Sequence, residues 1–320
     1  MERKTMSYKR VGDMSRRGVL ECMAWAGAGV VWTVSGGVPK SSQILGVGEA
    51  KAAEGGFSFL QISDTHIGFA KPANPNAAAT AQEAVAKINA LSAKPEFLIH
   101  TGDITHLAKP GEFDDADQII GKAGLVTHYV PGEHDVVDEN SGKAYFERYA
   151  KKSGGKGWGW YSFDHSGVHF VALVNVVELK KNGAGSLGAD QLAWLTEDLK
   201  GKSHSTPIVV FTHIPLWAIY PEWGWSTEDS AQALKLLKPF GSVTVLNGHI
   251  HQIVQKVEGR VTFHTARSTA FPQPEPGKAP TAGPMLVPAD KLRSVLGVTD
   301  VVYSQSNRRL ATTDVALSDG

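Results

Sequence analysis

Apolar and polar positions alternate in blocks along the chain from Phe57 onward. Short apolar runs predict buried strands at 57–63, 96–100, 125–130, 207–213 and 242–249. Amphipathic stretches between them predict helices at 76–92, 112–120, 143–150, 189–200 and 229–237. Strand-like runs joined by short turn sequences predict two hairpins, at 160–176 and 252–266. This alternation predicts an α/β fold with a parallel-rich sheet and an antiparallel part beside it.

Residues 1–52 have a different pattern. A basic stretch, MERKTMSYKRVGDMSRRGVL, runs into a mildly apolar, glycine-rich segment that is too short for the roughly 20 apolar residues of a membrane span. This order is typical of an export signal, and Ser15–Leu20 resembles a twin-arginine signal. The alternative is an ordinary basic tail. We expect a cleaved signal and linker, read by the twin-arginine export machinery, and a periplasmic or secreted protein without a stable membrane anchor.

Composition supports a folded domain and narrows its partners. The chain is 42% apolar, and Lys+Arg and Asp+Glu both number 32, so no net field attracts a nucleic acid polymer. It has 12 histidines and one cysteine, which favours imidazole over thiolate as a metal ligand. The cysteine, Cys22, lies in the predicted signal, so the mature chain would depend on packing rather than disulfides.

The C-terminal part is predicted to be an extension of the main domain. Residues 53–270 carry the strand and helix pattern. The proline-rich segment 271–284 predicts a covering loop, because proline cannot serve in central strands. The tail beyond Pro288 predicts a short helix and edge strands, so we expect 271–320 to pack on the domain formed by 53–270.

Side chains able to bind a metal follow the predicted strands. They are Asp64 and His66 in SDTHIG, Asp103 in TGDITH, Glu133 in PGEHD, His213 in FTHIP, and His249 and His251 in NGHIHQ. Turns at the carboxyl ends of strands in α/β sheets project such side chains into one crevice. Asp103, Glu133 and His249 each follow a glycine, which permits close backbone approach. Mixed carboxylate and imidazole ligands suit Zn, Mn, Fe, Co or Ni, and this number of ligands predicts two ions that share a carboxylate.

In this order, DTH, GD, G-x-H-D, THIP and GHIH resemble the calcineurin-like metallophosphoesterase superfamily over about residues 57–266. The resemblance implies a four-layer α/β/β/α sandwich of two mixed sheets flanked by helices. It implies that the first metal binds Asp64, His66 and His251, that the second binds His213 and His249, and that Asp103 bridges them. It also implies attack on phosphorus by a metal-activated hydroxide, with His134, steadied by Asp135, near the leaving group.

Glu133 departs from the family's third motif, G-N-H-[DE], where asparagine donates a neutral oxygen to the second metal. One added charge at about 4 Å is worth roughly 4 kcal/mol at an effective dielectric of about 20. Our preferred interpretation is that Glu133 is a ligand and that the site takes a harder or more oxidised pair, such as Fe with Mn, Zn or a second Fe. The alternatives are that Glu133 rotates away or is protonated, or that the centre hydrolyses phosphate esters poorly.

Other residues near these motifs have two interpretations each. His106, where purple acid phosphatases carry an iron-binding tyrosine, is an extra ligand, a hydrogen-bonding partner behind the ligands, or a solvated loop residue. His100 either supports the ligands by a hydrogen bond or is an ordinary strand histidine. The aromatic loop after His213, with Trp217, Tyr220, Trp223 and Trp225, forms either a pocket wall that stacks on a substrate ring or a satellite core. Arg267 could reach a phosphate.

The sequence therefore predicts an exported dinuclear-metal hydrolase that cleaves phosphomonoesters or phosphodiesters. The aromatic loop favours small ring-bearing substrates such as a nucleotide or cyclic nucleotide. The alternative is a metal-binding protein or oxidative metalloenzyme on the same scaffold, with phosphoesterase activity weakened by Glu133.

Overall fold

The computed structural model describes residues 30–35, 38–43, 56–138, 142–306 and 308–318. The chain divides into two compact units, Met1–Lys51 and Ala52–Gly320. In the first unit, β1 (Val30–Ser35) pairs antiparallel with β2 (Val38–Gln43). The twin-arginine stretch of the predicted signal lies outside the described residues. No helix in the described ranges has the length and apolar character needed to cross a bilayer.

The first sheet of the second unit has five strands in the order β13-β12-β3-β4-β5. Its parallel strands are β3 (Phe57–Ile62), β4 (Phe97–His100) and β5 (Val126–Tyr129). A C-terminal hairpin, β12 (Gly297–Ser304) and β13 (Arg309–Ala316), joins through β12, which pairs antiparallel with β3. The C-terminal tail thus completes the sheet.

The second sheet has six strands in the order β10-β11-β9-β8-β7-β6. Its centre is parallel and consists of β7 (Val168–Ala172), β8 (Ile208–Phe211), β9 (Val243–Asn247) and β11 (Val261–Thr265). Antiparallel strands β6 (Tyr161–His165) and β10 (Val254–Glu258) form its edges. Both sheets are mixed, as predicted.

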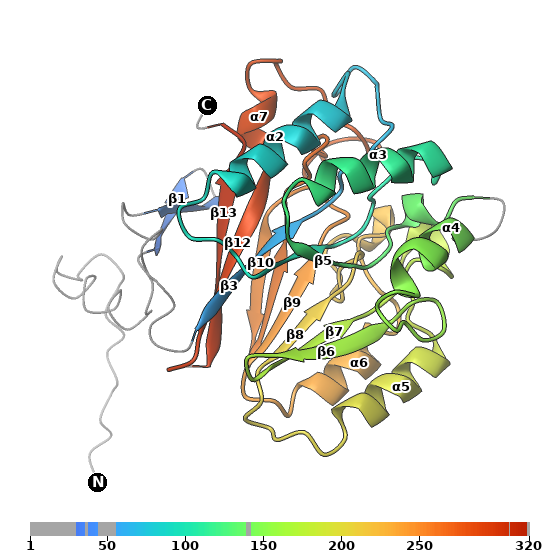
Figure 1. Cartoon of the computed structure of the whole chain (residues 1–320), viewed down its shortest axis with the longest axis vertical. Coiled ribbons are helices and arrows are strands. Elements are labelled where there is room, and N and C mark those ends of the chain that lie inside the picture. The colour runs from blue at the N-terminus through green and yellow to red at the C-terminus, as the bar shows by residue number, and fades with distance from the viewer. Residues whose placement is uncertain (1–29, 36–37, 44–55, 139–141, 307, 319–320) are drawn as a thin grey trace, which may run out of the picture. The chain divides into compact units, whose positions relative to one another are not determined.

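The two sheets pack against each other and helices cover their outer faces (Figure 1). On β3, Phe59 packs between the sheets against Phe170, while its neighbour Leu60 lies in the core under α2 (Ala77–Asn89) and α3 (Pro110–Gly121). On β8, alternate side chains likewise face the inter-sheet core or the core under α5 (Ala189–Leu199) and α6 (Ser230–Leu237). The four-layer sandwich is confirmed.

Predicted elements from 57 to 266 all have counterparts, with two corrections of extent, and the tail requires one correction of place. Segment 143–150 is a short helix, α4 (Lys143–Tyr145), continued by a π-helical turn, Phe146–Ala150. The strand predicted over 168–176 ends at Ala172, because the Gln191 side chain, rather than a neighbouring strand, hydrogen-bonds both backbone groups of Val174. In the tail, the short helix α7 (Leu292–Val295) is present, but β12 is an interior strand and only β13 lies at an edge.

Candidate metal centre

Seven acidic and histidine side chains from separate loops meet at the carboxyl ends of the parallel strands β3, β4, β5, β8 and β9. They are the seven residues that the sequence predicts as metal ligands: Asp64, His66, Asp103, Glu133, His213, His249 and His251. Strand direction explains this, because parallel strands bring their following turns to one edge of the sheet.

The first group comprises Asp64, His66 and His251, all buried. Nε2 of His251 lies 3.3 Å from Oδ1 of Asp64 and 3.3 Å from Nε2 of His66. The other ring nitrogen of His251, Nδ1, donates a hydrogen bond to the Phe271 carbonyl at 2.6 Å. That bond fixes the tautomer of His251 and directs the lone pair of Nε2 into the group.

The second group comprises Glu133, His213 and His249. Glu133 Oε2 lies 2.9 Å from Nε2 of His213, and Glu133 Oε1 lies 3.0 Å from Nδ1 of His249. Nδ1 of His213 donates to the Thr101 carbonyl at 2.7 Å, so its Nε2 is directed at the group. The alternative in which Glu133 rotates away is therefore wrong.

Asp103 lies between the two groups. Its Oδ2 is 3.4 Å from Nε2 of His66 in the first group and 3.4 Å from Nε2 of His213 in the second. One carboxylate thus approaches both sets of donors, which is the arrangement needed by two ions that share a ligand.

The donor set fits a pair of cations. Nε2 of His213, Oε2 of Glu133 and Nδ1 of His249 are buried and lack hydrogen-bond partners among the described residues. Each of the two ring nitrogens nevertheless lies about 3 Å from one oxygen of Glu133. Lone pairs this close repel unless a proton or a cation lies between them. Because the hydrogen-bond geometry is absent, a cation accounts for these contacts better. Carboxylate and imidazole donors together suit divalent or trivalent transition metals.

Two carboxylates of the centre, Asp64 and Glu133, have lowered pKa values. Burial by itself would raise the pKa of Asp64, but His251 and His213 lower it to about 2. Burial would likewise raise the pKa of Glu133, but the nearby His249 and His213 hold it well below its ordinary value. The alternative of a protonated Glu133 is thus disfavoured by the same histidines that surround it.

The backbone is strained at the centre. Positive φ angles, which non-glycine residues rarely adopt, occur at five residues of the two groups and the shared carboxylate: Asp64, His66, Asp103, His249 and His251. Such conformations cost of order 1–3 kcal/mol each and gather at functional sites. Close approach accompanies the strain, since a Cβ on Gly248 would lie 2.6 Å from Oδ2 of Asp64. The glycines before the ligands have the role predicted for them.

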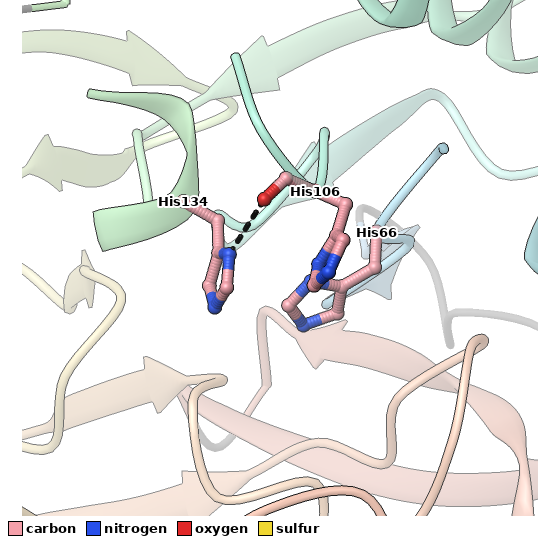
Figure 2. Close-up of side chains that lie close together, drawn as sticks. All are labelled: His66, His106 and His134. Atoms are coloured by element: carbon pink, nitrogen blue, oxygen red, sulfur yellow. Dashed lines mark hydrogen bonds between the residues drawn. The ribbon is translucent and has the colours of Figure 1, made fainter. Parts of the chain in front are cut away.

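His134 lies beside the two groups, on a 3₁₀ turn formed by Glu133–Asp135. Its Nδ1 donates to the His106 carbonyl at 2.7 Å, which leaves Nε2 free (Figure 2). Burial would lower the pKa of His134, but Asp103, Glu133 and the His106 carbonyl raise it above its ordinary value. The side chain is thus suited to hold a proton.

Asp135 does not steady His134 in the predicted way. Its buried carboxylate accepts hydrogen bonds from the backbone N–H groups of Gly132, Ile104 and Thr105 and from the Thr105 hydroxyl. These four bonds use the acceptor capacity of Asp135 within the loop, so the direct partner of the His134 ring is a backbone carbonyl. Asp135 thus holds the loop with the PGEHD motif against the loop with the TGDITH motif.

A family model for calcineurin-like phosphoesterases matches residues 57–253, which is more than half of the chain. The chain belongs to this family. The chain is 33% identical over 137 residues to purple acid phosphatase 23 of Arabidopsis thaliana, a match that covers 39% of this chain and 28% of that protein. It is 22% identical over 220 residues to a 3′,5′-cyclic-nucleotide phosphodiesterase of Nostoc sp., covering 67% of this chain and 79% of that one.

The fold is also similar to that of a solved dimetal phosphatase from Danio rerio. That structure has a TM-score of 0.62 at 13% identity, and the match covers 82% of this chain and 96% of that chain. The chain spans less than a third of the length of the matched purple acid phosphatase. Its family is one of phosphoesterases, and its histidine and carboxylate clusters fit the metal sites of such a family.

A cavity of about 400 Å³ lies above the candidate metal centre. Its floor includes His66, Asp103, Glu133, His134 and His249, and its walls come from three loops and one lysine. The wall residues are Leu179, Asn182, Gly183, Trp223, Trp225, Phe271, Gln273, Ala282, Gly283, Pro284 and Lys71. The proline-rich segment is therefore a wall of the cavity, as well as the source of the carbonyl that orients His251.

The aromatic loop divides between wall and core. Trp223 and Trp225 line the cavity and contact each other edge to face at 5.2 Å. Trp217 instead packs on Phe263 and under the Lys256 ammonium, and Tyr220 contacts Trp223 behind the wall. The prediction of a substrate wall thus fits Trp223 and Trp225, and Tyr220 packs against Trp223. The alternative of a core role fits Trp217.

Three other candidates occupy different places. His100 accepts from the Gly102 N–H and contacts the Thr65 hydroxyl at 3.1 Å, so it supports the TGD turn from behind. His106 lines the cavity. Arg267 donates to the Ser294 carbonyl and does not line this cavity, so the suggestion that it reaches a phosphate is not supported by the geometry.

Sequence reasoning missed Lys71, Phe271 and Gln273. Lys71 is the one Lys or Arg among the described residues that line the cavity. Phe271 packs its ring on His66 and His251, with ring centroids 4.8 and 4.5 Å apart. Gln273 donates to the His249 carbonyl at 3.1 Å. Only the proline-rich composition of 271–284 signalled that this segment covers something.

Proposed function

We propose that the protein is an exported dinuclear-metal phosphoesterase whose preferred substrates are ring-bearing phosphodiesters such as cyclic nucleotides, with phosphomonoesters cleaved less well. The observation that carries this proposal is the shared carboxylate of Asp103 between two donor groups under a cavity with tryptophan on its wall. The named activity of the Nostoc relative supports a diester.

The charge of the centre supports a preference for diesters. Glu133 adds a carboxylate where a neutral ligand would leave the centre more positive, so a monoanionic diester is repelled less than a dianionic monoester. Among the described residues of the cavity wall, Lys71 is the one Lys or Arg that opposes this negative charge. Trp223 offers a flat apolar surface on which a base or another ring can stack.

Asp64, His66 and His251 would hold one ion, Glu133, His213 and His249 would hold the other, and Asp103 would serve both. Bound there, two cations lower the pKa of water and offset the charge that develops on phosphoryl oxygens. The anionic Glu133 favours a harder pair, so we propose Fe with Mn, Zn or a second Fe. His134 would donate a proton from Nε2 to the leaving oxygen as the P–O bond breaks, so that the alcohol leaves neutral.

The experiment is elemental analysis of the purified protein together with turnover of bis(p-nitrophenyl) phosphate and p-nitrophenyl phosphate. We expect about two transition-metal ions per chain and a higher kcat/KM for the diester. A metal-loaded protein that turns over neither ester would instead support the alternative of a metal-binding or oxidative protein. The observation that favours this alternative is the added negative charge of Glu133.

Export is supported by the order of basic, apolar and small residues in 1–52. We expect the Arg16→Lys, Arg17→Lys double variant to keep the protein in the cytoplasm, with the matched variant Arg3→Lys, Lys4→Arg exported normally. Cell fractionation followed by N-terminal sequencing of the exported form measures this. Equal export of the two variants would remove the twin-arginine proposal and leave the hydrolase proposal untouched.

A further inference from the structure

Three histidines, His66, His106 and His134, lie close together at one side of the cavity (Figure 2). Each offers a ring nitrogen within 4.8 Å of the other two, which resembles a three-imidazole metal site. Only His66 belongs to either of the two donor groups that flank Asp103. His106 therefore requires a separate account.

The orientation of the rings argues against a third ion. The rings of His106 and His134 are stacked, with centroids 5.0 Å apart and planes 18° from parallel. A metal binds imidazole nitrogen close to the plane of the ring, and the nitrogens of two stacked rings lie in separate planes. The stacked arrangement therefore favours packing of His106 on His134 over joint coordination of one ion by the two rings.

His106 holds His134 in two ways instead. Its carbonyl accepts the Nδ1 hydrogen of His134 at 2.7 Å, so the other nitrogen, Nε2, is the one available for chemistry. Its ring covers one face of the His134 ring, and His66 packs edge to face against His134 at 4.8 Å. Contacts on the ring and on Nδ1 together fix its position and its tautomer.

His106 is itself firmly held. Its backbone N–H donates to the Ile67 carbonyl at 2.9 Å, and the next N–H, of Leu107, donates to the buried Glu112 carboxylate at 2.7 Å. Phe69 packs edge to face on the His106 ring at 5.1 Å. A carbonyl and a ring that are held this way can transmit a fixed geometry to His134.

We propose that His106 is a positioning residue for His134, whose imidazole it stacks on and orients toward the leaving oxygen of the substrate, and that it is not a metal ligand. This inference rests on the proposed function, in which His134 supplies the proton. Proton donation matters most when the leaving oxygen is a strong base, so the contribution of His106 should depend on the leaving group.

The experiment compares His106→Ala, which removes the ring, with His106→Phe, which keeps a flat ring but no nitrogen ligand. Each variant hydrolyses two diesters that differ in the leaving group, p-nitrophenolate or a simple alkoxide. We expect His106→Ala to lose about tenfold or more in kcat on the alkoxide ester and much less on the nitrophenyl ester, since small displacements of a catalytic group cost up to about 10²-fold. His106→Phe should lose clearly less on the alkoxide ester.

Two further measurements separate the outcomes. Metal content should stay at the wild-type level in both variants, and in a His134→Asn background His106→Ala should have little further effect. The exposed His204 provides the control variant His204→Ala, which should change none of these quantities.

Three results would overturn the inference. Loss of metal in both variants would make His106 a ligand. Equal loss on both esters, together with a lower melting temperature, would make it a structural residue. Full additivity with His134→Asn would mean that it acts elsewhere. If the wild-type protein hydrolyses no ester at all, the proposed function fails instead, and the metal-content comparison still decides whether His106 is a ligand.

Discussion

Gly132 shows how tightly the third motif approaches the shared carboxylate. A Cβ at this position would overlap with Oδ1 and the backbone nitrogen of Asp103. We expect Gly132→Ala to displace Asp103, to lower metal content and turnover sharply, and to destabilise the fold by about 1–3 kcal/mol. Elemental analysis and thermal unfolding measure the effects.

The control for that substitution is Gly111→Ala. Gly111 lies in the first turn of α3, and a Cβ there would meet no atom within 4 Å. Alanine is the better helix former by about 1 kcal/mol, so this variant should keep its metals and gain a little stability. Equal behaviour of the two variants would mean that the close approach at Gly132 has no functional consequence.

The second prediction at the scale of single residues concerns the charge of Glu133. Glu133→Asn removes one negative charge from between His213 and His249 but leaves an oxygen ligand. We expect the ratio of kcat/KM for p-nitrophenyl phosphate to that for the diester to rise about tenfold or more, because roughly 1.4 kcal/mol of lost repulsion is a factor of ten. The exposed Glu258 provides a control in Glu258→Gln. An unchanged ratio with unchanged metal content would contradict both the ligand role and the charge argument.

All seven proposed ligands could be predicted from sequence because each lies within four residues of the end of a strand, where local pattern and strand direction determine its place. Their supports could not. The carbonyls of Phe271 and His106 orient His251 and His134, and any residue type offers a carbonyl, so the sequence gives no signal for them. Asp135 was misplaced for a related reason: its partners are backbone N–H groups of a loop distant in the chain.

At the scale of elements, the β12–β13 hairpin is tied to the other sheet by a buried polar cluster. Asp314 on β13 accepts from the Thr299 hydroxyl at 2.7 Å and lies 3.0 Å from Nε2 of His264 on β11. Burial would raise the pKa of Asp314, but His264 and Thr299 lower it below its ordinary value. The charged carboxylate therefore stabilises the connection between the sheets.

We expect Asp314→Asn to lower the free energy of unfolding by about 1–3 kcal/mol near neutral pH. The pKa of Asp314 is depressed in the folded state, so its stabilisation is present above the unfolded pKa of about 3.9 and is lost as pH falls through the lower folded value. The difference between wild type and variant should thus shrink below about pH 4. Denaturant unfolding at pH 7, 5 and 3.5 tests the trend.

Asp300 on β12 supplies a control, because its pKa is shifted in the direction opposite to that of Asp314. Burial raises its pKa, so its charged form is disfavoured in the folded protein and it costs stability at neutral pH. Asp300→Asn should leave stability unchanged or raise it at pH 7. A loss of stability in both variants would indicate that the hairpin tolerates no change, rather than that the charge of Asp314 matters.

The elements of the fold could be predicted largely from local pattern, but their order in the sheets could not. Hairpins such as β6–β7 and β10–β11 can be predicted because their two strands are adjacent in the sequence and are joined by turn residues. The insertion of β12 beside β3 joins segments more than 230 residues apart, and no short-range pattern records such a pairing. For the same reason, the tail was expected at the edge.

At the scale of the whole molecule, the centre joins loops from both sheets, so its metals should affect the stability of the entire unit. Asp64 and Asp103 follow strands of the first sheet, and His213 and His249 follow strands of the second. Without cations, the carboxylate of Asp103 would lie within 4.8 Å of the carboxylates of Asp64 and of Glu133, with histidines around them. Chelation should therefore weaken the interface between the sheets as well as abolish turnover.

We expect chelator-treated protein to melt at a lower temperature and to recover in proportion to added Mn²⁺ or Zn²⁺. A ligand that binds only the folded state adds about 2.7 kcal/mol at a hundredfold excess over its Kd. Asp103→Asn removes the shared carboxylate, so it should raise the melting temperature of the metal-free protein and reduce the gain on adding metal. The melting temperatures of the wild type and of Asp103→Asn, each with and without metal, separate reduced charge repulsion from general destabilisation. A generally destabilised variant would melt at a lower temperature than the wild type both with and without metal. A wild-type melting temperature that is indifferent to chelation would mean that no cation couples the two sheets through these side chains.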